Sequence, residues 1–273
     1  IRSGPRTDAS RGLTALARFE QYATDEMWDA IRRLATDPVP TIRTMIAGNV
    51  DCVVHANPDL MWEILATCAA GDDHDDVLRA VADTAWRLRK VDARAVDLVV
   101  TVARRANQQG RRDSAIAGCA QIAGLMWVLE GDARAGAVVA DLGAGLDPSV
   151  LGQMLHEIRQ AGSFTSDDDA VRGRALDLCV QLIERGRREM DGWETVSEST
   201  PELDLVRIRA GIALLEVVAS QLAFASGFHD AKQNGSRSPN EAELRFATEV
   251  TSLFERLAGV PHPGITHKIG EVH

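Results

Sequence analysis

A five-residue segment recurs in this chain at a spacing of 34 residues. Met27–Ile31 reads Met-Trp-Asp-Ala-Ile, Met61–Leu65 reads Met-Trp-Glu-Ile-Leu, and the same offset reaches Ala95–Val99. Each copy opens an apolar segment with helical periodicity, and a second such segment follows it. Self-similarity at a fixed period of this length is typical of stacked helical pairs, because each pair buries its apolar face only against its neighbours. The repeat therefore predicts an all-α chain.

The composition supports helices and limits the partners. Of the 273 residues, 45% are hydrophobic and 4% are aromatic, and a chain rich in alanine, leucine and arginine favours helix over strand. The formal net charge is −10, which suits neither a nucleic-acid ligand nor an anionic membrane. We therefore expect no membrane partner, and we place nucleic acid second to protein as a partner.

Cysteine usage and the lack of targeting signals indicate a cytoplasmic protein. The four cysteines are widely spaced among apolar residues and form no C-x-x-C pair, which is the pattern of reduced core thiols. The best candidate for a membrane span, 212–225, is interrupted by Glu216 and Gln221, and no signal peptide is recognisable. The chain begins at Ile1 rather than Met, so we expect a fragment of a longer protein.

Helical periodicity predicts a succession of helices along the chain. The expected helices are 14–22, 26–35 with Asp25 as its N-cap, 39–55, 60–68, 77–88, 93–106, 113–129, 133–142, 148–161, 166–190, 203–224 and 241–257, with a last helix opening at Pro261. Two polar stretches, 191–200 and 229–240, are expected as loops. We predict one elongated helical-repeat domain over 1–273, with regular repeats in about 25–129, an irregular middle in 130–165 and C-terminal helical pairs in 166–273.

The turns before the second helices share a pattern of aspartate, a Val/Ile-Arg unit and alanine. It occurs as Asp37 before Ile42-Arg43 and Ala47, Asp73 and Asp76 before Val77–Arg79 and Ala82, Asp168-Asp169 before Val171-Arg172 and Ala175, and Asp204 before Val206-Arg207 and Ala210. This pattern resembles the HEAT repeat, in which the aspartate caps a helix and the arginine links neighbouring repeats. The resemblance implies a right-handed α-solenoid of HEAT/armadillo-like helical pairs with a curved binding face. The chain is also broadly similar to C-terminal helical regions of large bacterial multidomain ATPases and STAND-type defence proteins, which implies a sensor or scaffold role.

Three motifs suggest chemistry, and each also has a structural interpretation. Ala140–Gly145 resembles the glycine-rich turn of S-adenosylmethionine-dependent methyltransferases, but an Ala/Gly-rich helix with a glycine cap explains it as well. His156-Glu157 lacks the second histidine of a helical zinc site. The acidic stretches Gly71–Asp76 and Asp167–Asp169 lack the ligand spacing of a calcium loop, and we expect both to cap helices. We predict no catalytic, cofactor or metal site.

Arginines and one tryptophan are the candidate contact residues. Arginine side chains of the second helices and of one basic turn could bind phosphate or acidic peptide, or could instead brace the repeats. Trp28 and Trp62 hold equivalent repeat positions and are expected to pack between layers, whereas Trp193 lies in the polar loop 191–200. The predicted partner-binding residues are Arg43, Arg79, Arg104, Arg105, Arg111, Arg112 and Trp193.

These observations favour a non-catalytic protein-interaction, sensor or scaffold module of a larger bacterial protein. Its partner would be another protein or another domain of the same protein. The alternative is a nucleic-acid-binding accessory arm of a defence-type ATPase or nuclease, with a role in antiviral defence. A methyltransferase is the third hypothesis.

Overall fold

The computed structural model describes residues 4–108, 114–145, 147–191, 193, 196–197, 200–226 and 240–258. These residues form twelve α-helices and three short 3-10 helices, and no strand occurs among them. The prediction of an all-α chain is therefore confirmed. The chain divides into two compact units, unit 1 (Ile1–Ala123) and unit 2 (Gly124–His273). The single continuous domain expected from the sequence stays a prediction.

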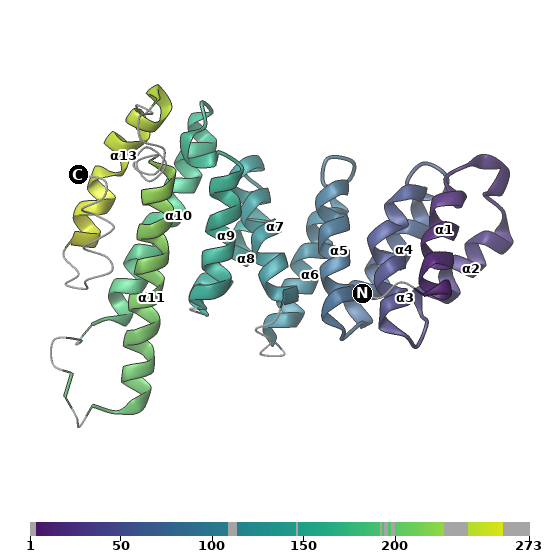
Figure 1. The fold of residues 1–273 in the computed structure, drawn as a ribbon, viewed down its shortest axis with the longest axis horizontal. Helices are drawn as coiled ribbons and strands as arrows, with labels where there is room; N and C mark the ends of the chain where they lie inside the picture. Colours follow the sequence, from purple (N-terminus) through teal and green to yellow (C-terminus); the bar gives the residue numbers. More distant parts are fainter. Residues whose placement is uncertain are drawn as a thin grey trace. The chain divides into compact units, whose positions relative to one another are not determined.

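Unit 1 is built from short helices that pair across two layers. Its elements are α1 (Pro5–Ala17), η1 (Glu20–Tyr22), α2 (Asp25–Ala35), α3 (Pro40–Asn49), η2 (Val50–Val53), α4 (Pro58–Gly71), α5 (Asp75–Leu88) and α6 (Arg94–Gln108), and α7 (Ser114–Glu130) begins in this unit. Helix α3 contacts both α1 and α5, and helix α4 contacts both α2 and α6, so these helices form two layers (Figure 1). Contacts of α2 with α3 and of α4 with α5 join the two layers.

Local chemistry explains where these helices begin. Pro40 and Pro58 occupy the first turns of α3 and α4, where a missing backbone N–H costs nothing. Asn57 caps α4, because its side chain accepts a hydrogen bond from the Leu60 amide over 3.1 Å. The N-cap of α2 is Thr24, whose side chain accepts from the Met27 amide, so the prediction of Asp25 as this cap was wrong by one residue.

Two of the expected helices differ from the structure. The first helix runs over Pro5–Ala17 rather than 14–22. It buries Ser10 and Thr14, whose hydroxyls donate to the carbonyls of Arg6 (2.8 Å) and Arg11 (3.0 Å), and this local bonding removes the cost of burying them. The expected helix 39–55 is α3 followed by the 3-10 turn η2. The predicted loop 229–240, apart from Asn240, and the helix opening at Pro261 lie outside the described residues.

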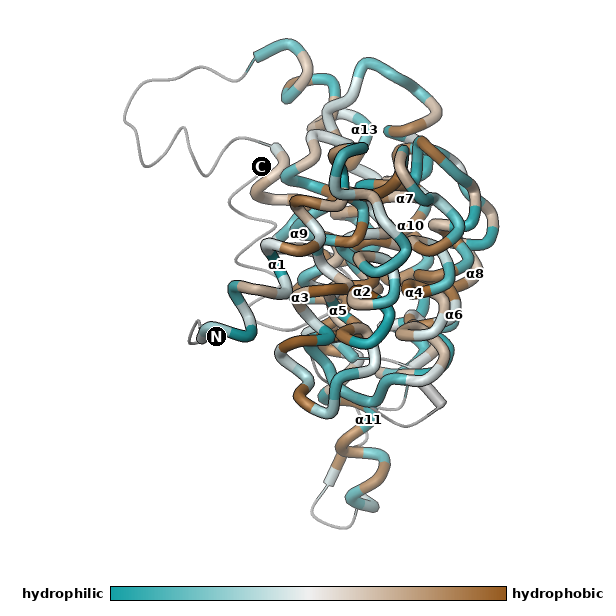
Figure 2. The backbone as a smooth tube through the Cα atoms, turned by 90° about the vertical axis from the view of Figure 1, so that its right-hand side faces the viewer, coloured by the Kyte–Doolittle hydropathy of each residue, from teal (hydrophilic) through white to brown (hydrophobic). Residues whose placement is uncertain are grey.

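The core of unit 1 follows the repeat. Trp28 of α2 and Trp62 of α4 are 8% and 7% exposed, so the two equivalent tryptophans are both buried as expected. Ile31 and Leu65, also equivalent at the 34-residue spacing, are fully buried. Hydrophobic and hydrophilic residues alternate in short bands along the helices (Figure 2), which is the pattern of helices with one face in the core.

Unit 2 contains five further helices and one short 3-10 turn in its described part. They are α8 (Ala133–Ala144), α9 (Pro148–Gln160), α10 (Asp169–Glu189), α11 (Glu202–Ala225) and α13 (Glu241–Ala258), with the 3-10 turn η3 (Ser163–Thr165). Helix α11 packs against α9, α10 and α13. The α10–α11 crossing is close, because a Cβ on Gly211 would lie 2.8 Å from the carbonyl oxygen of Gly186.

Two predicted motifs of unit 2 turn out to be parts of helices. Ala140–Ala144 lie inside α8, and the amide of Gly145 donates to the carbonyls of Asp141 and Leu142. These residues therefore form the capped helix rather than the strand and turn of a methyltransferase motif. Asp168 caps α10 through bonds from the amides of Ala170 and Val171, as expected for this acidic stretch.

Helix α11 is both long and apolar. Within the described part of the chain it is the one helix whose length and apolar composition would allow it to cross a membrane. Half of its apolar window is buried inside the protein, and core helices pass the same test. The absence of a membrane partner stays a prediction.

Candidate partner-binding groove

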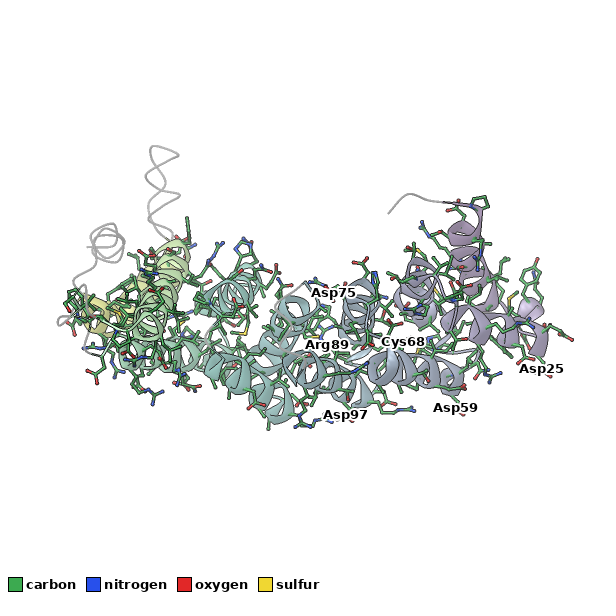
Figure 3. All side chains as sticks on the ribbon, turned by 90° about the horizontal axis from the view of Figure 1, so that it is seen from below. Asp25, Asp59, Cys68, Asp75, Arg89 and Asp97 are labelled. Carbon is green, nitrogen blue, oxygen red and sulfur yellow. The ribbon has the colours of Figure 1, made fainter. Side chains whose placement is uncertain are left out.

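A groove of about 540 Å³ lies between α4 and α6 of unit 1. Its floor and walls are mainly small or apolar, its rim carries carboxylates, and the residues that line it are Asp59, Trp62, Glu63, Ala66, Ala69, Ala70, Arg94, Asp97, Leu98 and Thr101. Acidic side chains gather on this side of the unit: Asp25, Asp59 and Asp97, from α2, α4 and α6, lie along one edge (Figure 3). An apolar floor with a few polar groups is the usual construction of a binding site.

The sequence explains why a groove is open between α4 and α6. Between the preceding two helices of this layer, α2 and α4, the Arg32 side chain lies between Asp29 (Nη1–Oδ1 3.1 Å) and Glu63 (Nε–Oε1 3.5 Å). The residue 34 positions after Arg32 is Ala66. The long Arg32 side chain links α2 to α4, whereas the equivalent residue between α4 and α6, Ala66, has only a methyl group as its side chain.

Trp62 and Arg94 form one end of the groove. The Arg94 guanidinium lies 4.7 Å from the centre of the Trp62 ring, within the range of a cation–π interaction. Its Nη2 also donates to Asp92 over 2.7 Å. This hydrogen bond raises the pKa of Arg94 above its ordinary value, so the guanidinium stays charged and is held at the groove end.

Arg43, the first predicted contact residue, links turns inside unit 1. Its Nε and Nη2 both donate to the carboxylate of Asp72, the second over 3.0 Å, and its Nη1 donates to the carbonyl of Asp37 over 2.7 Å. The hydrogen bond with Asp72 raises the pKa of Arg43. Burial acts to raise the pKa of Asp72, but the bonds from Arg43 and from the His74 amide lower it below the usual range. The pair therefore braces the structure.

The structure describes three of the other five predicted arginines. Arg105 donates to the carbonyl of Asp72 (2.7 Å) and pairs with Asp73, so it braces the same turn. Arg79 pairs with Asp83 of its own helix over 3.0 Å, and its side chain covers Gly118 of α7. Arg104 is exposed and has no partner among the residues that the structure describes. The remaining two, Arg111 and Arg112, lie outside the described residues.

Trp193, the last predicted contact residue, lies in unit 2 and is half-buried. Its amide donates to the carbonyl of Met190 over 2.9 Å, so the backbone of this position is tied to the end of α10. The predicted arginines that the structure describes, Arg43, Arg79, Arg104 and Arg105, all belong to unit 1.

A second cavity of about 570 Å³ surrounds the Arg43–Asp72 pair, between the turns that precede α3 and α5. Its charged groups already bind one another, since Asp37 also pairs with Arg6. Cys68 lines it, and burial raises the pKa of this thiol to about 11. This makes Cys68 a weak nucleophile at neutral pH. We therefore interpret this cavity as part of the structural link that the Arg43–Asp72 pair makes between the turns before α3 and α5.

The acidic turn Gly71–Asp76 is used for capping, as the sequence indicated. Asp72 accepts from the His74 amide over 2.9 Å, and the His74 side chain accepts from the Asp76 amide over 3.3 Å. Within the described part of the chain, no three side chains of histidine, cysteine, aspartate or glutamate are placed to hold a metal ion together.

Sequence analysis missed the groove, although the signal for it is in the repeat. Asp29, Glu63 and Asp97 form a column of acidic residues at the 34-residue spacing. The same spacing aligns Trp28 with Trp62, next to these charged residues. The position of Arg32 is alanine in the next repeat, and the groove lies there, between α4 and α6.

Comparison with known proteins adds no assignment to this geometry. No protein-family model matches the chain, and no curated protein is significantly similar to it in sequence.

Proposed function

We propose that this chain is a non-catalytic protein-interaction module of the HEAT/armadillo-like α-solenoid class, and that the α4–α6 groove receives a basic segment of a protein partner. The groove itself is the observation that carries the proposal. It combines a volume of about 540 Å³, an apolar floor that includes Ala66, Ala69 and Leu98, and a rim that includes Glu63 and Asp97.

The solenoid part of the proposal is supported by the repeat and by the contacts inside unit 1. The layers α1–α3–α5 and α2–α4–α6 are those expected of stacked helical pairs. The Arg43–Asp72 pair joins residues 29 positions apart, as an arginine that links neighbouring HEAT repeats would do. The right-handed sense of the stack belongs to the same proposal.

The charge of the groove favours protein over nucleic acid as the partner. Nucleic-acid affinity depends on arginines and lysines that neutralise phosphates. Of the predicted contact arginines, Arg43 and Arg105 bind carboxylates and carbonyls of unit 1, and the groove rim is acidic. A basic peptide would meet complementary charge there, which steers association as well as orientation.

The test is a titration with fluorescent peptides of equal length that are basic, neutral or acidic, followed by anisotropy. We expect the basic peptide to bind, with an affinity that falls as salt is added. Ala70 is exposed and lines the groove, so Ala70→Phe should fill part of the space and weaken binding. Ala137→Phe, at an exposed position of α8, is the matched control and should leave the affinity unchanged.

Three results would count against the proposal. One is that no peptide binds. Another is that Ala70→Phe and Ala137→Phe bind the basic peptide as the wild type does. The third is that duplex DNA binds with a steep salt dependence while the peptides do not, which would support the nucleic-acid alternative.

A further inference from the structure

We propose that unit 2 contains a second binding site, a cavity between α8 and α10 that takes a carboxylate carried on a short apolar chain. The inference does not depend on the α4–α6 groove, because it concerns other residues and a ligand of the opposite charge. The cavity has a volume of about 240 Å³. Helix α8 lines it with small and apolar residues, and α10 adds two arginines, Arg185 and Arg188.

The inner part of the cavity is apolar. Val139, Leu178 and Leu182 line it and are at most 3% exposed. Gly143 leaves space beside them, because a Cβ at this position would lie 3.8 Å from a methyl group of Leu182. The volume gives room for about eight groups the size of a water molecule, at about 30 Å³ each, which suits a carboxylate with a short alkyl chain such as hexanoate.

Arg188 supplies a positive charge at this cavity. It is exposed, and its side chain has no hydrogen bond or ion pair among the residues that the structure describes. Glu184, one turn earlier on α10, pairs instead with Arg256 of α13 (Oε1–Nη1 3.2 Å). Glu189, the residue after Arg188, pairs with Arg185 (Oε1–Nη2 2.7 Å). Each of these carboxylates therefore has a cation of its own, and the charge of Arg188 is left for a ligand.

Arg185 supplies a hydrogen-bond donor in the wall of the cavity. Its Nη2 donates to the carbonyl of Ala144 over 3.2 Å and pairs with Glu189, so the guanidinium is held in place from two sides. Its Nε is buried and has no acceptor in the described part of the chain. Buried donors are nearly always paired in folded proteins, so this one points to an acceptor from another molecule. A small rotation of the side chain is needed to bring the covered Nε–H to that acceptor.

The two arginines together favour a carboxylate. A guanidinium is a planar fork of N–H donors that matches the two oxygens of a carboxylate, and such charge-assisted hydrogen bonds are stronger than neutral ones. Binding sites commonly join a largely apolar lining to a few polar groups that fix the orientation of the ligand. An alkyl chain would lie against Val139, Leu178 and Leu182, whereas inorganic phosphate would leave this apolar part of the cavity unused.

The experiment is a nuclear magnetic resonance titration of the full ¹⁵N-labelled chain with four probes. They are hexanoate, its neutral analogue hexanamide, acetate and inorganic phosphate. We expect hexanoate to bind about tenfold more tightly than hexanamide, the change that one close charge pair can produce. Acetate and phosphate should bind more weakly than hexanoate because they bury no alkyl chain. The Nε–H signal of Arg185 should shift with hexanoate, since this donor gains an acceptor.

Substitutions at the charged edge test the role of Arg188. Arg188→Gln should weaken hexanoate binding by about tenfold and leave hexanamide binding unchanged. Arg209→Gln is the matched control, because Arg209 is exposed on α11, pairs with Glu202 and does not line the cavity. It removes the same charge and should change the affinity by less than about twofold, because solvent screens exposed charges that are not in contact.

A second pair of variants tests the position of the site. Ala140 is exposed on α8 and lines the cavity, so Ala140→Phe should fill its mouth and weaken hexanoate binding by at least about tenfold. Ala137→Phe, one turn earlier on the same helix and outside the cavity, should leave the affinity unchanged. Circular dichroism of all four variants checks that they are folded.

Several results would overturn the inference. If hexanoate causes no shifts, the cavity is not a carboxylate site. If hexanamide binds as tightly as hexanoate, or Arg188→Gln has no larger effect than Arg209→Gln, the arginines do not select a carboxylate. If phosphate binds more tightly than hexanoate, the class of ligand is wrong. The α4–α6 groove and its basic peptide are unaffected by each of these results.

Discussion

Replacing Asp72 should destabilise unit 1 far more than replacing an exposed aspartate. The Asp72 side chain is 6% exposed, and that of its partner Arg43 is 19% exposed. Asp72→Asn removes the charge but keeps an oxygen that can accept from the His74 amide. Asp72→Ala removes the ion pair and this hydrogen bond together.

The expected magnitudes follow from the bonds that each change breaks. A hydrogen bond to a charged group contributes about 1.5–3 kcal/mol, and we take about 2 kcal/mol for Asp72→Asn because Arg43 can regain some water. The bond to the His74 amide stabilises the turn before α5, and its loss adds about 1 kcal/mol, as for a helix cap. We therefore expect Asp72→Ala to cost about 3 kcal/mol of unfolding free energy.

Urea denaturation followed by circular dichroism measures these differences at neutral pH. Asp83→Asn is the matched control, because Asp83 pairs with Arg79 of the same helix and both side chains are exposed (44% and 38%). We expect this control to cost about 0.3–0.5 kcal/mol. If Asp72→Ala and Asp83→Asn had equal effects, the Arg43–Asp72 pair would not be a structural link, and the assignment of Arg43 to bracing would be refuted.

Three further predictions follow from burial and packing. Gly211→Ala should lower the free energy of unfolding by about 1–3 kcal/mol, because its Cβ would press on a backbone oxygen. Gly173→Ala, where nothing lies within 4 Å, should instead stabilise α10 by about 0.5–1 kcal/mol. Equal effects of the two variants in urea unfolding would contradict the close α10–α11 crossing. Because the pKa of Asp72 is lowered by folding, its contribution is present above the unfolded pKa of about 3.9 and is lost as the pH falls through the folded pKa. The stability difference between wild type and Asp72→Asn should therefore shrink in acid, and a difference that grew on acidification would show the sign to be wrong. Burial raises the pKa of both Cys52 and Cys68, that of Cys68 to about 11, but Cys52 is only half-buried whereas Cys68 is buried. A thiol reagent at pH 8 should therefore label Cys52 first and Cys68 only after unfolding, as mass spectrometry of the labelled peptides would show.

The candidate site shows where prediction from the sequence stops. The pattern of aspartate and Val/Ile-Arg drew attention to Arg43, and it left open whether the arginines bind a partner or brace the repeats. In the structure, the guanidinium groups of Arg43 and Arg105 bind the Asp72–Asp73 turn. A sequence pattern cannot decide this question, because a guanidinium that bonds inside the chain and one that faces a partner occupy the same helical position.

Local signals along the chain suffice to predict most of the helices and the period of the repeat. Helical periodicity, Pro58 at the start of α4 and the Asp168 cap of α10 act over about four residues, so they can be read without the fold. The pairing of the charged residues and the position of the open groove depend instead on how the helices pack. Arg43 meets Asp72 across 29 positions, and Arg105 meets the same turn across 33. Such contacts exist only after the helices have packed, since packing brings the residues together and determines how much water remains around them.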